Sequence, residues 1–152
     1  MSDVPYHRQQ QDYTCGPAVL KMVLAWYGKQ EEEEAIAQKL GTNPKTGTTR
    51  KAIVSYLKQG GIRCKPITKA SFDDLFISAS SNAIVVVNYV EPTDNEGHYA
   101  LAIHASETSI VLHDPHNGAY FEMDPQEFRK RWEGHHTRDK SKGWMVVVEQ
   151  AA

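Results

Sequence analysis

The hydrophobic period of the sequence changes near its middle, and this change restricts the fold more than any other feature. Apolar residues recur at helical spacing through residues 17–59, whereas most of the second half alternates between apolar and polar residues, as half-buried strands do. Helices that precede the strands, rather than alternating with them, favour the α+β class. We therefore expect N-terminal helices packed on one face of a mostly antiparallel sheet.

Local signals divide the two halves into elements. The first helix is apolar on so much of its surface that it should lie at the centre of the protein. Capping boxes at Ser71–Asp74 and Asp124–Glu127 mark the start of the last two helices. The helices are expected over residues 17–27, 31–40 and 48–59, from residue 71 and from residue 125. The strands are expected over residues 62–67, 84–90, 99–104, 109–114, 120–123 and 144–148.

The composition excludes several classes of function. The 152 residues are expected to form one domain, residues 1–152. A formal net charge of -2 gives no reason to expect nucleic acid or an anionic membrane as the main partner. No apolar run approaches the roughly 20 residues that span a bilayer. The start of the chain lacks the basic and apolar regions of a signal peptide, so we expect a cytoplasmic location.

The chain has two cysteines, and one of them stands where a reactive thiol would stand. Cys15 comes just before the first expected helix, whose N-terminus offers partial positive charge and free N–H groups that stabilise a thiolate. Gly16 would let backbone or substrate approach the sulfur. The plainer alternative is a small buried residue at a helix start, and a buried residue is also our interpretation of Cys64.

A thiolate nucleophile needs a base, and the base needs a partner that orients it. Residues 98–114 supply both if they form a hairpin that turns at Ser106. His98 then lies directly opposite Asp114, on the same face of the hairpin. A surface histidine and a turn-forming Asp-Pro pair are the alternative interpretation.

The same register predicts which face of the hairpin meets the first helix. The face of His98 carries Ala100 and Ala102, and two alanines leave room for a close approach, so we expect the helix after Cys15 to pack there. A slip of one residue would separate His98 from its partner. The opposite face carries the larger side chains of Tyr99, Leu101, Ile103 and Val111.

Attack on a carbonyl also requires hydrogen-bond donors for the oxyanion that develops. The backbone N–H of Cys15 can be one donor, and a side-chain amide just upstream can be the other. Gln9, Gln10 and Gln11 are all candidates, and their positions alone do not choose between them.

Together these elements resemble the double-glycine leader peptidase family, the bacteriocin-processing cysteine peptidases and their stand-alone relatives. The resemblance rests on Gln9, Cys15-Gly16-Pro17-Ala18, Gly97-His98-Tyr99 and Asp114-Pro115, in that order. It implies a papain-like fold, with Cys15 as nucleophile and His98 as general base and acid. It also implies that Asp114 orients His98, that Gln9 is the oxyanion donor, and that the substrate is a peptide or protein, cut in this family after a Gly-Gly-type leader.

The resemblance leads us to expect a cysteine peptidase that needs no cofactor and no metal. Two other functions stay open: an acyltransferase with the same triad, and a non-catalytic peptide-binding module with the same fold. A zinc hydrolase built on His113 and His116 is a more distant alternative, because His113 should point away from Asp114. His135-His136 is interpreted as part of a solvated loop, and residues 91–97 as a mobile connection, with a rim or a lid of the site as the alternatives.

Overall fold

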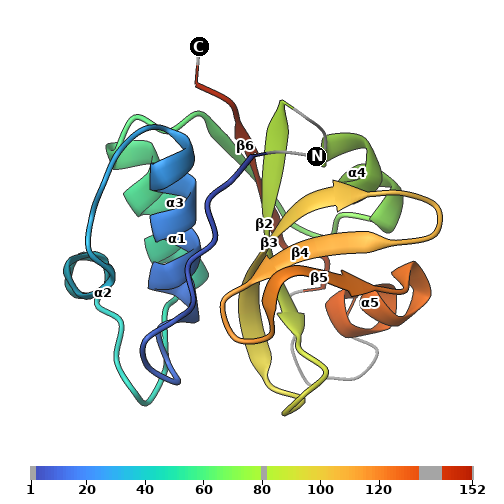
Figure 1. Ribbon diagram of the computed structural model, residues 1–152, viewed down its shortest axis with the longest axis horizontal. Helices are drawn as coiled ribbons and strands as arrows, with labels where there is room; N and C mark the ends of the chain where they lie inside the picture. The colour runs from blue at the N-terminus through green and yellow to red at the C-terminus, as the bar shows by residue number, and fades with distance from the viewer. Residues whose placement is uncertain (1–2, 80–81, 134–141, 152) are drawn as a thin grey trace.

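The computed structural model describes residues 3–79, 82–133 and 142–151, and its elements follow the expected order (Figure 1). Every expected helix and strand is present, with its ends shifted by only a residue or two. The helices are α1 (Cys15–Trp26), α2 (Glu33–Leu40), α3 (Arg50–Gln59), α4 (Phe72–Ser78) and α5 (Pro125–Trp132). The strands are β1 (Cys64–Ile67), β2 (Ala83–Val90), β3 (Gly97–Ala105), β4 (Ile110–Asp114), β5 (Gly118–Met123) and β6 (Met145–Glu149).

The strands form one sheet in the order β1-β6-β2-β3-β4-β5, and each neighbouring pair is antiparallel. The α+β class and the antiparallel sheet are therefore confirmed. The N-terminal helices α1, α2 and α3 lie on one side of the sheet, as expected, but α4 and α5 lie on the other side (Figure 1). Within the described residues, no helix combines the length and apolar character needed to cross a membrane.

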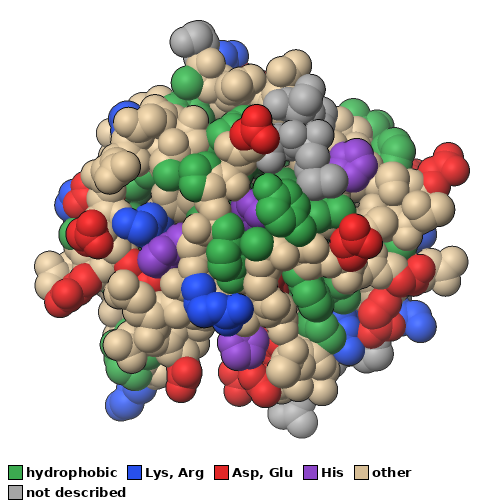
Figure 2. All heavy atoms as spheres, in the orientation of Figure 1, with side chains coloured by type: hydrophobic (Ala, Val, Ile, Leu, Met, Phe, Trp, Pro, Cys, Tyr) green, Lys and Arg blue, Asp and Glu red, His purple; other side chains and the backbone are tan. Residues whose placement is uncertain are grey.

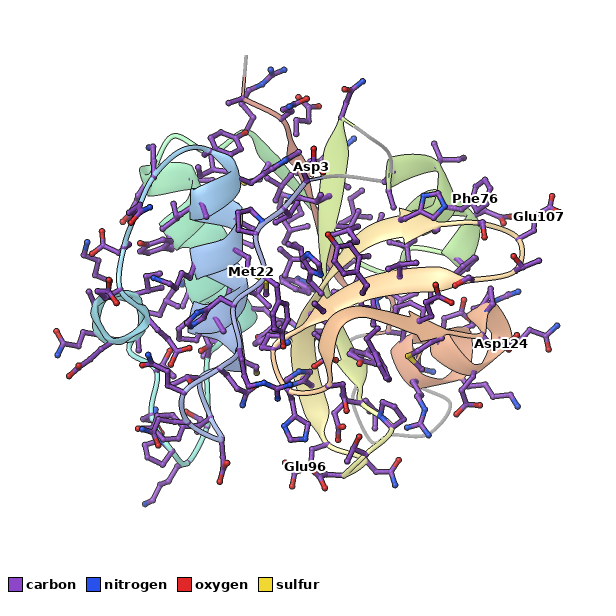
Figure 3. The ribbon with its side chains drawn as sticks, in the orientation of Figure 1. Asp3, Met22, Phe76, Glu96, Glu107 and Asp124 are labelled. Carbon is purple, nitrogen blue, oxygen red and sulfur yellow. The ribbon has the colours of Figure 1, made fainter. Side chains whose placement is uncertain are left out.

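The two faces of the sheet carry separate apolar clusters. Val19 and Val23 of α1 belong to the same cluster as Leu101 and Ile103 of β3, and Met22 of α1 is buried with them (Figure 3). The face that carries the two alanines of β3 belongs instead to the cluster of α4 and α5, with Phe72, Phe128 and Trp132. The expectation that the Cys15 helix packs on the alanine face is therefore wrong. Large aromatic side chains fill the space that the small residues leave.

Helix starts follow local capping rules. Ser71 and Asp74 form the expected capping box at α4, with both reciprocal hydrogen bonds present. At α5 the Asp124 carboxylate accepts the N–H groups of Gln126 and Glu127, so Asp124 caps the helix as expected, but the described contacts do not include the reciprocal bond from Glu127 that would complete the expected capping box. The Glu127 carboxylate accepts a hydrogen bond from Arg131 Nε at 2.8 Å, one turn further along the helix.

The N-terminal segment, residues 3–14, runs between the helices and the sheet (dark blue in Figure 1). On the sheet side, the Tyr6 hydroxyl donates to the backbone oxygen of Asp114 at 2.6 Å. On the helix side, His7 Nε2 lies 3.0 Å from Oε1 of Glu33 in α2. The segment therefore reaches the boundary where α1 and β3 both begin.

Candidate active site

A cavity of about 240 Å³ lies where the N-terminus of α1 approaches the start of β3. Cys15 is the first residue of α1, and His98 is the second residue of β3. Both line the cavity, together with Gln9 from the N-terminal segment and His116 from the β4–β5 turn. Four separate parts of the chain thus contribute side chains to one small volume.

Gly16 allows the start of α1 to come close to the chain just before α3. A Cβ atom added to Gly16 would lie 2.6 Å from Oγ1 and 2.8 Å from Cβ of Thr48. Thr48 is itself held, because its Oγ1 lies 2.7 Å from Oγ1 of Thr42 and its backbone oxygen accepts the Tyr99 hydroxyl at 2.8 Å. The neighbour that requires a glycine here is therefore Thr48.

His98 and Asp114 form a buried pair. His98 Nε2 lies 2.7 Å from Oδ1 of Asp114, and the two residues are 6% and 0% exposed. Burial alone would lower the pKa of His98, but hydrogen bonds to Asp114 and Cys15, and the charges of both, raise it to about 10. Because Nε2 is used by Asp114, Nδ1 is the ring nitrogen left for Cys15. The imidazolium form of His98 is therefore favoured beside the sulfur.

The hairpin register differs from the expected one. Leu101 pairs with His113 and Ala102 with Leu112, and a bulge follows between Ala102 and His104. His98 therefore does not lie directly opposite Asp114, and that expectation is wrong. The shift is by an even number of residues, however, so both side chains stay on one face and meet along a diagonal. The turn spans residues 106–109 rather than centring on Ser106, so Ala105 pairs with Ile110, an offset of three residues from the expected register. The bulge takes up one residue, which leaves the even offset of two at the pair.

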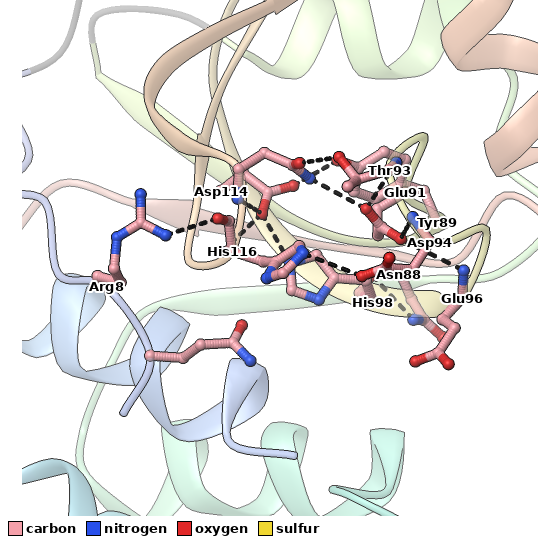
Figure 4. A network of polar contacts seen from close by, with 12 residues as sticks. Arg8, Asn88, Tyr89, Glu91, Thr93, Asp94, Glu96, His98, Asp114 and His116 are labelled. Carbon is pink, nitrogen blue, oxygen red and sulfur yellow. Dashed lines mark hydrogen bonds and ion pairs between the residues drawn. The ribbon is translucent and has the colours of Figure 1, made fainter. Parts of the chain in front are cut away.

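The Asp114 carboxylate is surrounded by donors (Figure 4). Its Oδ1 accepts a hydrogen bond from Nε2 of His98. The same oxygen accepts hydrogen bonds from the backbone N–H groups of His116 and Asn117, both at 2.9 Å. Its Oδ2 accepts the hydroxyl of Tyr89. Burial would raise the pKa of Asp114, but the hydrogen bond and positive charge of His98, with the other donors, lower it to about 2. Asp114 is therefore a carboxylate at neutral pH.

Tyr89 is a residue of the site that the sequence analysis missed. It lies in β2 directly opposite His98, it is 2% exposed, and burial together with the Asp114 charge raises the pKa of its hydroxyl. The sequence held one signal for it: a tyrosine in a mostly apolar, buried strand must find a partner for its hydroxyl. That partner is the carboxylate of Asp114 in β4, on the far side of β3.

The three glutamines occupy different environments. Gln9 lines the cavity, whereas the side chains of Gln10 and Gln11 are exposed. Gln9 Nε2 donates to the backbone oxygens of Gln11 at 2.8 Å and Asp12 at 3.2 Å. Its Oε1 is buried and has no hydrogen-bond partner among the described residues.

The segment that carries Gln9 is held from two sides. On the sheet side, the Gln9 N–H donates to the backbone oxygen of Pro115 at 3.1 Å, and Arg8 donates to that of His116 at 2.7 Å (Figure 4). On the helix side, the N–H of Gln10 donates to the carboxylate of Glu33, which is only 2% exposed. Glu33 lies in the helix expected over residues 31–40, and its burial depends on a contact from a distant part of the chain.

The histidines outside the pair lie in different places. His113 is buried on the opposite face from Asp114, as expected, where Nε2 lies 2.8 Å from the backbone oxygen of Val4. His116 lies with Glu91 and Asp94 in a group whose potential metal-ligating atoms are within 4.8 Å of one another. Both Glu91 carboxylate oxygens already accept backbone N–H groups of the 91–97 loop. His135 and His136 lie outside the described residues.

Sequence comparisons place this chain among peptidases. The family model described as the Peptidase C39 family matches residues 3–137. An uncharacterized protein of Methanothermobacter thermautotrophicus is 31% identical over 107 residues, which cover 70% of this chain and 68% of that protein.

Several solved structures share the fold. The peptidase domain of Streptococcus ComA, a bi-functional ABC transporter involved in quorum sensing, has a TM-score of 0.74 at 23% identity, covering 96% of this chain and 98% of that one. A double glycine motif protease from an AMS/PCAT transporter, solved with its leader peptide, has a TM-score of 0.77 at 18% identity and covers 99% and 94%. A putative C39-like peptidase from Bacillus anthracis has a TM-score of 0.75 at 14% identity and covers 100% and 97%.

N-terminal helices that carry a cysteine at their start, packed on an antiparallel sheet that carries a histidine, define the papain-like fold of these peptidase domains. Within that class, this chain belongs to the peptidase C39 family. The expected resemblance to double-glycine leader peptidases is thereby confirmed at the level of family and fold.

Proposed function

We propose that this chain is a cysteine peptidase and that residues 1–152 form one catalytic domain. Its family and its papain-like fold support a peptidase. The observation that carries the assignment of residues is His98, which is hydrogen-bonded to the buried carboxylate of Asp114 and lines the same small cavity as Cys15, whose thiol helps to raise the pKa of His98. A nucleophile, a base and an orienting group in contact are what covalent acyl chemistry requires.

In the first half of the reaction, the Cys15 thiolate attacks the carbonyl carbon of the scissile peptide bond. The electron pair of the carbonyl moves to its oxygen and then returns as the C–N bond breaks. The His98 imidazolium gives its proton to the leaving nitrogen, which departs as an amine, and the acyl group remains on sulfur as a thioester. Asp114 holds the ring by Nε2, so that the proton is presented from Nδ1.

In the second half, neutral His98 takes a proton from water, and the hydroxide oxygen attacks the thioester. The C–S bond breaks, the acid product leaves, and the thiolate–imidazolium pair is restored. Asp114 stabilises the imidazolium in both halves without taking its proton, because its own pKa is near 2.

The oxyanion of each tetrahedral intermediate is stabilised by two donors, the backbone N–H of Cys15 and Nε2 of Gln9. First-turn N–H groups have no partner within the helix, so that of Cys15 can bind substrate. Gln9 Nε2 has two hydrogens, and its longer contact is the one to Asp12 at 3.2 Å. We expect the oxyanion to replace that contact.

The proposed function is tested by incubating the protein with a peptide library, including leaders that end in Gly-Gly, and identifying the products by mass spectrometry. We expect cleavage that disappears in the Cys15→Ala protein and persists in EDTA. Products joined to a library amine or thiol would instead identify an acyltransferase. If chelation abolished the activity and added zinc restored it, the reaction would instead depend on a zinc ion held by the histidines.

A further inference from the structure

The cavity around Cys15 and His98 is strongly acidic. Among the described residues that line it, four are carboxylates, and none is a lysine or an arginine. Figure 2 shows acidic side chains beside a histidine at the lower centre of the face, over the β2–β3 loop. A cleft lined by charge of one sign concentrates the potential and selects ligands of the opposite sign. The four carboxylates are Asp12, Glu91, Asp94 and Glu96.

These carboxylates stand on two sides of the Cys15–His98 pair. Asp12 comes from the N-terminal segment, before α1, whereas the other three come from the β2–β3 loop before His98. Asp12 and Glu96 are exposed at the mouth of the cavity. A peptide that crosses the thiol must therefore pass between acidic groups contributed by both halves of the fold.

The β2–β3 loop is held in place by its own polar contacts. The buried Glu91 carboxylate accepts hydrogen bonds from the N–H groups of Thr93 at 2.9 Å and Asp94 at 2.7 Å. Burial would raise the pKa of Glu91, but these hydrogen bonds outweigh it and lower the pKa. Arg131 of α5 donates to the side-chain oxygen of Asn95 at 2.9 Å and to the backbone oxygen of Val90 at 3.2 Å. The loop is therefore a rim that presents Glu96 in a defined position (Figure 3).

The rim charges are only partly compensated. His116 Nε2 lies 3.2 Å from Oδ2 of Asp94, which offsets one carboxylate when that histidine is protonated. In the proposed pair, the negative charge of the Cys15 thiolate and the positive charge of the His98 imidazolium cancel each other. Arg8 donates to the backbone oxygen of His116 at 2.7 Å and adds one positive charge at the edge of the cavity (Figure 4). The carboxylates still outnumber the nearby cations, so they would repel an acidic peptide and attract a basic one.

We propose that the substrate carries a lysine or arginine within two residues of the scissile bond, where it meets Asp12 on one side of the thiol or Glu96 on the other. This rests on the proposed peptidase function and adds to it the chemical class of the substrate. The distance along the peptide is short because the same small cavity contains the reacting sulfur.

The test uses peptides in a sequence taken from the library screen, in which each of the two positions on either side of the scissile bond is changed in turn to Lys, Gln or Glu. We expect kcat/KM to fall in the order Lys, Gln, Glu, by about two- to five-fold for each exposed carboxylate that the charge meets. The ratio of Lys to Glu peptide should shrink in the double variant Asp12→Asn/Glu96→Gln and in about 0.5 M NaCl.

Glu107→Gln is the matched control, because this exposed residue lies on the β3–β4 turn, far from Glu96 (Figure 3). It should leave the Lys to Glu ratio unchanged. Equal kcat/KM for the three peptides at every flanking position, or a ratio that survives in the double variant, would overturn the proposal. Such cleavage without charge preference would leave the proposed peptidase function intact.

Equilibrium binding separates the two proposals if no peptide is cleaved. The same fluorescent peptides are titrated into the Cys15→Ala protein, which retains the acidic rim. Tighter binding of the Lys peptide than the Glu peptide, lost in the double variant, supports the acidic cleft even if the peptidase function fails. Equal affinities would overturn it.

Discussion

Asp114 is the residue on which the geometry of the site depends. Four donors from three parts of the chain meet its carboxylate: His98, Tyr89 and the N–H groups of His116 and Asn117. A neutral amide in its place would present N–H groups to some of these donors and would remove the charge that supports the imidazolium.

Asp114→Asn should therefore lower kcat by at least about 100-fold while leaving the protein folded. The pKa of His98 lies above its ordinary value, so the imidazolium persists through neutral pH and is lost only as the pH rises through about 10. Without the Asp114 charge, this alkaline loss of activity should move to lower pH. The pH profile of kcat/KM measures the shift, and an unchanged profile with full activity would show that Asp114 does not orient His98.

The two thiols should react at different rates. Cys15 meets His98 at the start of α1, whereas burial raises the pKa of Cys64 in β1. Because only the thiolate is alkylated, iodoacetamide near neutral pH should label Cys15 at least about tenfold faster than Cys64. Mass spectrometry of the native protein follows both sites at once. Faster labelling of Cys64 would contradict the proposed nucleophile.

Gln9→Ala should lower kcat by about 10²–10³ with little change in KM, because an oxyanion donor acts mainly in the transition state. The rate of Cys15 alkylation should stay unchanged, since Gln9 takes no part in the proton transfer. Gln10→Ala and Gln11→Ala are matched controls with exposed side chains and should be nearly normal. If Gln10→Ala were the inactive variant, the mechanism would stand with another donor.

At the scale of elements, the site depends on how closely α1 approaches its neighbours. The N-terminus of α1 lies against Thr48, which precedes α3, and an added methyl group at Gly16 would overlap it. The position of Cys15 relative to β3 therefore depends on a glycine next to it in sequence and on a threonine more than 30 residues away.

Gly16→Ala should destabilise the protein by about 1–3 kcal/mol, the usual effect of overpacking. Thr48 cannot move away freely, because it is hydrogen-bonded to Thr42 and Tyr99. Urea unfolding measures the change in the free energy of unfolding. Gly97→Ala is the control, since a Cβ atom there meets no atom within 4 Å. Equal stability of the two variants would mean that the approach of α1 is looser than the structure indicates.

At the scale of the whole molecule, the N-terminal segment joins the helical side to the sheet side. His113 anchors it through Nε2, which donates to Val4, while Nδ1 accepts the N–H of Tyr120 at 3.3 Å. The rings of Tyr6 and Tyr120 pack edge-on against it. In the neutral ring, both nitrogens are therefore hydrogen-bonded, and burial lowers the pKa of His113.

A lowered pKa makes the contribution of His113 to stability complete above about pH 6.5, the ordinary value, and progressively lost as the pH falls below it. The loss cannot exceed about 1.4 kcal/mol per pH unit for one proton. The raised pKa of His98 has the opposite effect, because its contribution to stability grows as the pH falls in this range. The effect of His113 is therefore isolated by comparing the wild type with His113→Gln. Urea unfolding at pH 7.5 and 5.5 should show the larger acid-induced loss in the wild type.

The sequence alone determined which segments are helices and strands, because caps, glycines and hydrophobic period act over a few residues. Ser71, Asp124 and the buried first helix were predictable on this ground. The sequence also predicted that His98 and Asp114 share a face, but the structure reaches this outcome through the bulge, which turns the odd offset at the turn into an even offset at the pair.

Only the tertiary structure decided the rest. The bulge after Ala102, the face of the sheet on which α1 packs, and the burial of Glu33 depend on contacts between segments far apart in sequence. The bond from Tyr89 to Asp114 depends on the pairing of three strands. Local rules do not contain these contacts, because each one is set by how complete elements fill space together. The charge of the cavity follows from the same packing, which brings Asp12 and the 91–97 loop to the two sides of one thiol.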